Sequence, residues 1–442
     1  MTPTNIPTWD PLKNVYVRFC ALFFGLAILT DPNGTCVPLE FLHQYYEGLL
    51  HSLIQWIGRH IVHLSYPITQ FTGGSGDTTY DWLTLASLTV FSILVTIVWS
   101  AIDRRRKSYP VLYEWLTVGI RYYLAFTMIE YGAGKVVKLQ FPVPRLTTLL
   151  QPYGSSSPMH LAWTFFGFSK AYNYFTGMAE LIAGSLLLFR RTTRLGAILS
   201  LAVMANIMAI NYCFDVCVKL LSTVLVLMCI FLLLKERHHY LAFFFHKRRK
   251  PADPEALADP ANRADPEIPA RLRPRRKWIR ISLLVTKILL ITSVFVLNIY
   301  GVMTLERERG EKAPKPPLWG IYEVTTFVKN RDTLPPLITD TLRWRKFIIS
   351  SAGRASLLLM NDSVRSYDCK VDTLKKSMIL YLDADTNRRS LLTYTSVGKD
   401  SLLLRGNLRS DSVHLTLRRF DERKFLLNNR GFHLISETPF NR

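Results

Sequence analysis

Seven stretches of about twenty largely apolar residues alternate with short polar segments along the chain. A helix of about twenty apolar residues is long enough to cross the hydrocarbon core of a bilayer. The pattern therefore predicts a polytopic membrane protein. The seven expected transmembrane helices cover residues 14–30, 81–101, 110–132, 170–189, 195–213, 216–234 and 281–303.

Beyond the seventh apolar stretch the pattern changes to short apolar runs separated by turn-forming residues. Consecutive short strands of this kind favour an antiparallel meander, either closed as a lipocalin-like β-barrel or folded as a sandwich. The fold class is thus a helical membrane domain followed by an antiparallel β domain. Eight strands are expected, at residues 318–328, 342–350, 355–360, 364–371, 377–382, 390–395, 401–404 and 413–417.

Changes in composition divide the chain into five regions. Within the first, residues 38–62 have apolar positions at helical spacing and are expected to lie along the membrane surface. Within the third, residues 251–276 lack apolar periodicity and are expected to form a disordered linker. The regions are an N-terminal pair of helices with an external loop (1–109), a four-helix core (110–234), an interfacial segment with the linker (235–280), the seventh helix (281–303) and a β-rich domain (304–442).

The formal net charge of +22 first suggests a nucleic-acid partner, but the distribution of the charge excludes that class. Basic clusters lie beside the apolar stretches, at residues 104–107, 190–194 and 247–250. This is the positive-inside pattern, which places these loops and the N-terminus in the cytoplasm and the C-terminus outside. From Thr304 onward the 25 basic and 16 acidic residues give a net charge of +9, which suits an anionic partner such as lipid headgroups or a cell-wall polymer, or an ordinary solvated surface. A periplasmic protein is a further expected partner of the β domain.

Several expected membrane helices contain charged residues. A charge at mid-membrane costs at least about 3 kcal/mol unless it is paired or reaches water, so these residues are candidates for a functional site. Glu114, Arg121 and Lys135 are separated by seven and fourteen residues and share one helical face. Glu180 lies at a similar expected depth to Arg121, and we predict that these two side chains form a pair.

A second polar group lies where the fifth and sixth helices meet. Asp215 and Lys219 are four residues apart and can pair, while Cys213 and Cys217 have a spacing that permits a thiol pair. No cysteine spacing suggests a metal site. The candidate ligand-binding residues are Arg121, Glu130, Lys135, Glu180, Asn206, Asn211, Asp215 and Lys219; the alternative is that they form structural ion pairs.

Three segments show a resemblance to a known family: Tyr131 to Lys135, Gly177 to Leu188, and Arg190 to Ala197. They are similar to the DoxX-like family of bacterial membrane proteins over residues 110–234, and the whole chain resembles a longer subgroup from Bacteroidota. The resemblance implies a four-helix bundle in the bacterial inner membrane and, as one activity, quinone-linked electron transfer. The best-matched positions are Gly132, Lys135, Glu180, Gly184 and Gly196.

Three functions follow from these features. The first is binding of a lipid-like or quinone-like ligand in the helical bundle, with the β domain engaging a periplasmic partner. The second is a component of a quinone-linked oxidoreductase, with quinone as cofactor and Cys213 and Cys217 as redox thiols. The third is a proton-coupled transporter that uses Glu130, Glu180 and Asp215 as a relay. Whether the protein is an enzyme is left open.

Overall fold

The computed structural model describes residues 9–30, 37–66, 68, 74–245, 277–382, 389–398, 400–408 and 410–431, together with 433, 435 and 438. The expected linker, 251–276, lies outside the described residues. The chain forms two compact units. The helical unit consists of Met1–Phe141 and Pro158–Glu306, and the barrel unit of Pro142–Ser157 and Arg307–Arg442. Residues 142–157, which the sequence analysis assigned to the four-helix core, thus belong to the barrel unit.

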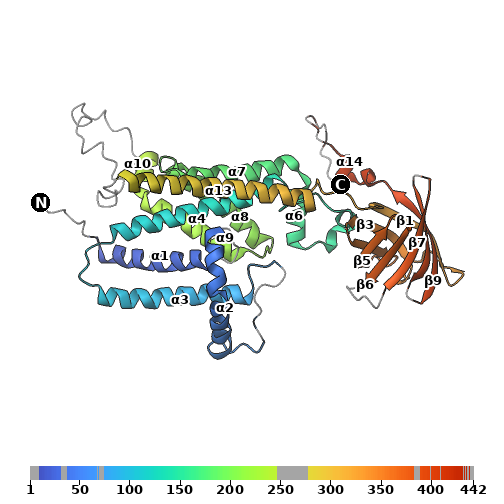
Figure 1. Ribbon diagram of the computed structural model, residues 1–442, viewed down its shortest axis with the longest axis horizontal. Coiled ribbons are helices and arrows are strands. Elements are labelled where there is room, and N and C mark those ends of the chain that lie inside the picture. Colours follow the sequence, from blue (N-terminus) through green and yellow to red (C-terminus); the bar gives the residue numbers. More distant parts are fainter. Residues whose placement is uncertain are drawn as a thin grey trace. The chain divides into compact units, whose positions relative to one another are not determined.

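Helices occupy all seven positions where apolar stretches predicted them (Figure 1). The amphipathic segment at residues 38–62 is also helical, and it runs across the direction of its neighbours (Figure 1). The helices of this unit are α1 (Pro11–Leu29), α2 (Val37–His60), α3 (Thr79–Ile102), α4 (Pro110–Val136), α6 (Pro158–Phe168), α7 (Lys170–Leu188), α8 (Thr193–Cys213), α9 (Lys219–Lys235), α10 (Arg237–Phe245) and α13 (Lys277–Arg309).

Four of these helices are long and apolar enough to cross a membrane: α1, α3, α8 and residues 284–309 of α13. The length and composition of these helices identify the chain as a membrane protein. The other three helices at predicted positions are shorter or more polar. α9 has 17 residues, α4 contains four charged side chains, and α7 contains Lys170 and Glu180. The seven-span topology stays a prediction.

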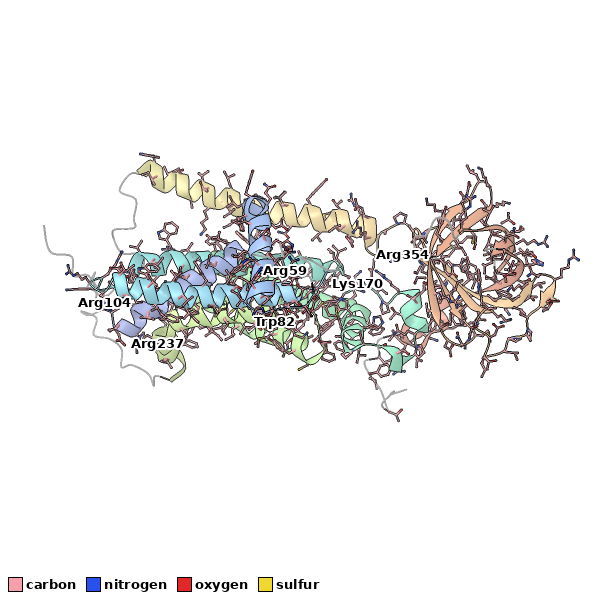
Figure 2. All side chains as sticks on the ribbon, turned by 90° about the horizontal axis from the view of Figure 1, so that it is seen from below. Arg59, Trp82, Arg104, Lys170, Arg237 and Arg354 are labelled. Atoms are coloured by element: carbon pink, nitrogen blue, oxygen red, sulfur yellow. The ribbon has the colours of Figure 1, made fainter. Side chains whose placement is uncertain are left out.

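The helical unit has two distinct ends. At the basic end, which we define by residues 103–109, 189–193 and 235–241, the buried guanidinium of Arg18 donates to the Tyr109 hydroxyl and to the Asp103 carbonyl, at 2.6 and 2.9 Å. At the opposite end, the backbone amide of Gly76 donates to the carbonyl of Cys217 at 2.8 Å. Figure 2 shows Arg104 and Arg237 at the basic end and Lys170 toward the other. The long helices α1, α3, α4, α7, α8 and α9 therefore alternate in direction along the chain.

Glycines allow α4 and α7 to pack closely. A Cβ atom added at Gly132 would lie 2.8 Å from the carbonyl oxygen of Gly177, and one at Gly184 would lie 2.9 Å from that of Ala125. Real side chains do not tolerate such approaches to backbone, so only glycine fits at these positions. Gly177 and Gly184 therefore let α4 approach α7 closely.

The barrel unit contains the eight predicted strands and one short addition. β1 pairs antiparallel with β2 and with β3, and from β3 to β9 each strand pairs antiparallel with the next. β1 also pairs with β9, so the sheet closes into a barrel. The predicted closed-barrel alternative is therefore confirmed. The strands are β1 (Gly320–Lys329), β2 (Asp332–Thr333), β3 (Trp344–Ser351), β4 (Arg354–Leu359), β5 (Val364–Asp372), β6 (Ser377–Leu382), β7 (Arg389–Val397), β8 (Ser401–Leu408) and β9 (Asp411–Phe420).

Side chains fill the described interior of the barrel, with Phe327, Trp344 and Phe347 among the largest. A second apolar cluster covers part of the barrel wall, where Leu146 of α5 (Leu146–Leu150) packs with Ile348 and other apolar residues. Two further short elements, η3 (Glu422–Lys424) and α14 (Leu426–Asn429), follow β9.

Candidate functional site

Lys135 of α4 and Glu180 of α7 form an ion pair inside the helical unit. Their exposed fractions are only 5% and 1%. The Lys135 ammonium also lies 5.9 Å from the centre of the Phe141 ring. The second carboxylate oxygen of Glu180 has no hydrogen-bond partner among the described residues. The predicted pair of Arg121 with Glu180 is therefore wrong, because Lys135 takes that place.

The register of α4 against α7 explains this correction. The close contacts at Gly132 with Gly177 and at Ala125 with Gly184 set Glu180 level with Ile129. Arg121 lies eight residues, or about 12 Å, further along α4 toward the basic end. Lys135 lies six residues away in the other direction, and its long flexible side chain reaches Glu180. The sequence analysis had estimated depth from the ends of the apolar stretches and could not see the register.

Asp77, Lys219 and Asp215 form a clasp at the opposite end of the helical unit. The backbone amides of Lys219 and Leu220 donate to the Asp77 carboxylate at 2.8 and 3.0 Å, which satisfies donors at the start of α9. The Lys219 ammonium lies 2.8 Å from Asp215 and 3.6 Å from Asp77. The predicted Asp215–Lys219 pair is confirmed. Asp77 thus caps α9, whereas Thr78 with Asp81 caps α3.

The remaining predicted site residues do not converge on this clasp. Asn211 is buried and donates to the carbonyl of Val218 at 3.3 Å, whereas Asn206 is exposed on α8. Glu130 is half-buried and makes its own interaction. Lys135 and Lys219 are not brought to one site, because Lys135 pairs with Glu180 and Lys219 pairs with Asp215 and Asp77.

Cys213 and Cys217 are both free thiols, one exposed and one half-buried. Their spacing of four residues would place them on one face of a continuous helix, but α8 ends at Cys213 and α9 begins only at Lys219. Between them Asp215 has a positive φ of 51°, which breaks the helical path. The two residues therefore do not share a helical face.

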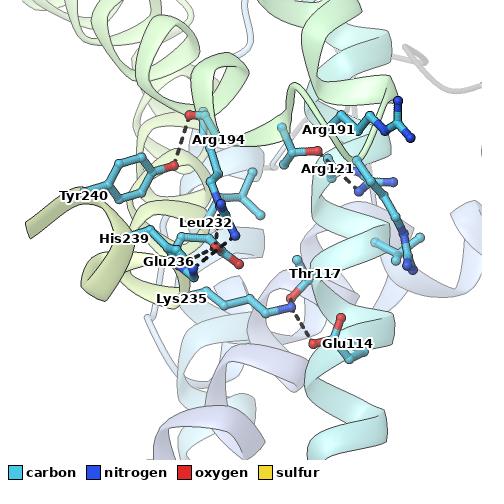
Figure 3. A pocket seen from close by; sticks show the side chains of 14 residues that line it. Glu114, Thr117, Arg121, Arg191, Arg194, Leu232, Lys235, Glu236, His239 and Tyr240 are labelled. Atoms are coloured by element: carbon cyan, nitrogen blue, oxygen red, sulfur yellow. Dashed lines mark hydrogen bonds and ion pairs between the residues drawn. The ribbon is translucent and has the colours of Figure 1, made fainter. Parts of the chain in front are cut away.

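A polar pocket of about 320 Å³ opens at the basic end of the helical unit (Figure 3). We call it the basic pocket. Its walls come from α4, from the turn before α8, and from α8, α9 and α10. The lining residues are Glu114, Thr117, Val118, Arg121, Arg190, Arg191, Thr193, Arg194, Ala197, Leu232, Lys235, Glu236, His239 and Tyr240.

Both carboxylates of the basic pocket are already paired. The Lys235 ammonium lies 2.7 Å from Glu114 and donates to the Thr117 hydroxyl at 3.2 Å. Glu236 accepts from the Arg194 guanidinium at 2.9 Å and lies 3.1 Å from the His239 ring. The first pair holds α9 to α4, and the second holds the junction of α9 and α10 to α8. The second pair lies on the side of the pocket away from Arg121 (Figure 3).

Tyr240 closes the pocket from α10. Its hydroxyl donates to the backbone carbonyl of Arg194 at 3.0 Å. Burial, with Glu236 nearby, raises the pKa of Tyr240 to about 12, so the hydroxyl keeps its proton at neutral pH. This contact fixes α10 against the start of α8.

Three guanidinium groups of the pocket, those of Arg121, Arg190 and Arg191, have no carboxylate partner among the described residues. Arg190 and Arg191 are exposed, but Arg121 has an exposed fraction of only 6%. Arg121 donates to the Thr193 hydroxyl at 3.4 Å, and its Nε finds no acceptor among the described residues. A buried cation normally requires a paired anion, so the pocket is suited to binding one.

The basic pocket was missed as a site by sequence reasoning. Arg190, Arg191 and Arg194 were interpreted only as topology signals, and Lys235 and Glu236 were not singled out. One signal was available, because a helix face carrying Glu114 and Arg121 must meet a partner, and the basic turn before α8 lies at the same end of the bundle. Within the described parts of the chain, no three His, Cys, Asp or Glu side chains are grouped to hold a metal ion.

Comparisons with known proteins gave one informative match. Over 127 residues the chain is 41% identical to the uncharacterised protein YwoB of Bacillus subtilis, strain 168, and the match covers 29% of this chain and 76% of YwoB. No family profile matches the chain. No solved structure matches it either.

Proposed function

The chain belongs to the same family as YwoB of Bacillus subtilis, and from the basic pocket we propose that it is a membrane protein that binds the anionic headgroup of a lipid-like molecule. One observation carries the proposal: the buried guanidinium of Arg121 lines an open pocket and has no carboxylate partner among the described residues. A phosphate or carboxylate would supply the missing charge.

The composition of the pocket supports this choice of ligand. Its lining contains five Arg or Lys side chains but only two Glu, and both Glu are engaged with other cations. Arginine binds phosphate and carboxylate oxygens with two donors in a planar fork. The exposed Arg190 and Arg191 can therefore approach a headgroup from the rim while Arg121 holds it from the wall.

The position of the pocket supports a membrane ligand. It lies at the basic end of the helical unit, where α4 and α8 begin and α9 ends, and α8 is long and apolar enough to span a membrane. From the positive-inside rule we propose that the basic end faces the cytoplasm of a bacterial cell, that the pocket lies near the inner headgroup layer of the inner membrane, and that the barrel lies in the periplasm. Anionic phospholipids are abundant ligands at that depth.

Three other expectations about family and function stay predictions. Membership of the DoxX-like family, quinone-linked chemistry and the proton relay rest on resemblance or on spacing alone. The partner of the barrel likewise stays a prediction.

The direct test is lipid-dependent stability of the purified full chain in mild detergent. Binding to the native state raises the unfolding temperature. We expect phosphatidylglycerol to raise it and phosphatidylcholine to have little effect. Since a hydrogen bond to a charged group contributes about 1.5–3 kcal/mol, Arg121→Gln should weaken the apparent affinity about 10- to 150-fold.

Two further variants control this experiment. Arg190→Gln changes an exposed rim residue, so it should fold normally and still weaken binding. Arg59→Gln removes an exposed arginine of α2 that does not line the pocket, and it should bind like the original protein. Equal stabilisation by both lipids, or equal affinities of the Arg190 and Arg59 variants, would contradict the proposal.

A further inference from the structure

Lys287 lies at the start of the apolar part of α13, the helix that follows the linker. The segment able to cross a membrane begins at residue 284, so Lys287 is three residues inside it. No ion pair involves Lys287 in the part of the chain that the structure describes. Its ammonium instead lies 6.0 Å from the centre of the Tyr122 ring and 5.8 Å from that of Phe189.

These two aromatic residues adjoin the basic pocket. Tyr122 follows Arg121 on α4, and the Arg121 guanidinium lies 5.2 Å from the centre of the same ring. Phe189 directly precedes Arg190 of the pocket rim. The Arg121 guanidinium and the Lys287 ammonium therefore both lie close to the Tyr122 ring, at 5.2 and 6.0 Å from its centre. A cation of the pocket, Arg121, and a cation of α13, Lys287, thus share Tyr122 as a neighbour.

α13 itself packs loosely on the rest of the helical unit. Val294 is its one fully buried residue among those described. Around Lys287 the apolar side chains are exposed, with fractions of 53% for Ile288 and 63% for Leu289. Exposed apolar side chains on a membrane helix face lipid. An acyl chain can lie against this surface, whereas a water-soluble anion gains nothing from it.

We infer that Lys287 and Tyr122 mark a lateral entrance from the bilayer to the basic pocket, and that the ligand is an anionic phospholipid whose acyl chains stay against α13. This inference rests on the proposed function and adds the route and the class of ligand. Lysine attracts a phosphate as a point charge on a flexible stem, and the tyrosine ring is suited to the boundary between chains and headgroups. Lys287 draws the phosphate toward Arg121 as the lipid arrives.

The test uses the full chain in nanodiscs that contain phosphatidylglycerol with a photoreactive diazirine in one acyl chain. After illumination, labelled peptides are identified by mass spectrometry. We expect labelling of α13 near residues 284–295 and of the neighbouring face of α4, at a higher level than with a matched phosphatidylcholine probe. Lys287→Gln should reduce the labelling about fivefold, the factor that one lysine contributes near an anionic lipid.

The control variant is Arg307→Gln, which removes an exposed cation from the last turn of α13 and should leave the labelling unchanged. Glycerol 3-phosphate serves as the soluble competitor. If it binds as tightly as the lipid, with α13 unlabelled, the lateral entrance is overturned while an anion-binding pocket stands. If neither compound binds, the proposed function fails with it. Equal labelling by the two lipid probes also overturns the inference.

Discussion

Lys135 and Glu180 form an ion pair that is buried between two helices at the point where glycines bring those helices into contact. Desolvation makes such a pair costly to bury, so it contributes little net stability. Removing one partner is different, because the other charge then stays buried without compensation. We therefore expect the loss of one partner to destabilise the protein strongly, and the replacement of both partners by apolar residues to have a small effect. We call this pair the clamp.

A double-mutant cycle tests this clamp. We expect Glu180→Leu and Lys135→Met each to lower the free energy of unfolding by about 3–5 kcal/mol, and the double variant to lie within about 1–2 kcal/mol of the original protein. The measurement is unfolding of the purified chain in detergent. Additive losses in the double variant would show that the two side chains act independently.

The glycine contacts between α4 and α7 give a second prediction. Gly132→Ala should destabilise the protein by about 1–3 kcal/mol, because the added methyl group meets the carbonyl of Gly177. Gly134→Ala is the matched control on the same helix, since nothing lies within 4 Å of its added Cβ. The control should be neutral or stabilising by up to about 1 kcal/mol. Equal thermal stability of the two variants would contradict the close packing.

The clasp at the opposite end gives a third prediction. Asp77→Ala should cost about 1–2 kcal/mol, because it leaves the amides of Lys219 and Leu220 without their acceptor. Asp215→Ala removes the other carboxylate that pairs with Lys219. The Asp215 side chain is 82% exposed, so its loss should cost less than about 1 kcal/mol. Thermal unfolding of both variants compares them, and a larger loss from Asp215→Ala would refute this ranking.

The barrel unit has a pH-dependent contact. The ammonium of Lys329, 2.9 Å away, and the amide of Asn330, 2.7 Å away, hold the pKa of the Asp411 carboxyl below its usual range. A depressed pKa stabilises the folded state above the unfolded pKa, near 3.8, and this stability is lost as the pH falls through the folded pKa. Asp411→Asn should therefore lower the unfolding temperature between pH 5 and 7 but not at about pH 2. A difference that persists unchanged at the acidic pH would exclude this carboxylate as its cause.

Apolar periodicity predicted most of the fold. The positions of seven helices and eight strands follow from where apolar residues recur at helical or strand spacing, which is a local property of the chain. Closure of the barrel through β1 and β9 depends on distant residues, and the sequence analysis therefore left the barrel and the sandwich as alternatives.

The candidate site was predicted less well, for a physical reason. Partners of charged residues in a bundle depend on the register between helices, and the glycine contacts that set this register involve residues far apart in the sequence. Arg121 was singled out as a charged residue of an expected membrane helix and is buried in the helical unit, but its surroundings come from the turn before α8 and from α9. Asp215 and Lys219 were paired correctly, because their contact is local.

The most direct test of the central claim is the lipid that remains bound to the purified protein. Mass spectrometry of the intact chain, extracted in mild detergent, should detect about one anionic phospholipid per protein. The Arg121→Gln variant should lose it, and the Arg59→Gln variant should keep it. An empty original protein, or the same lipid retained by all three proteins, would contradict the account.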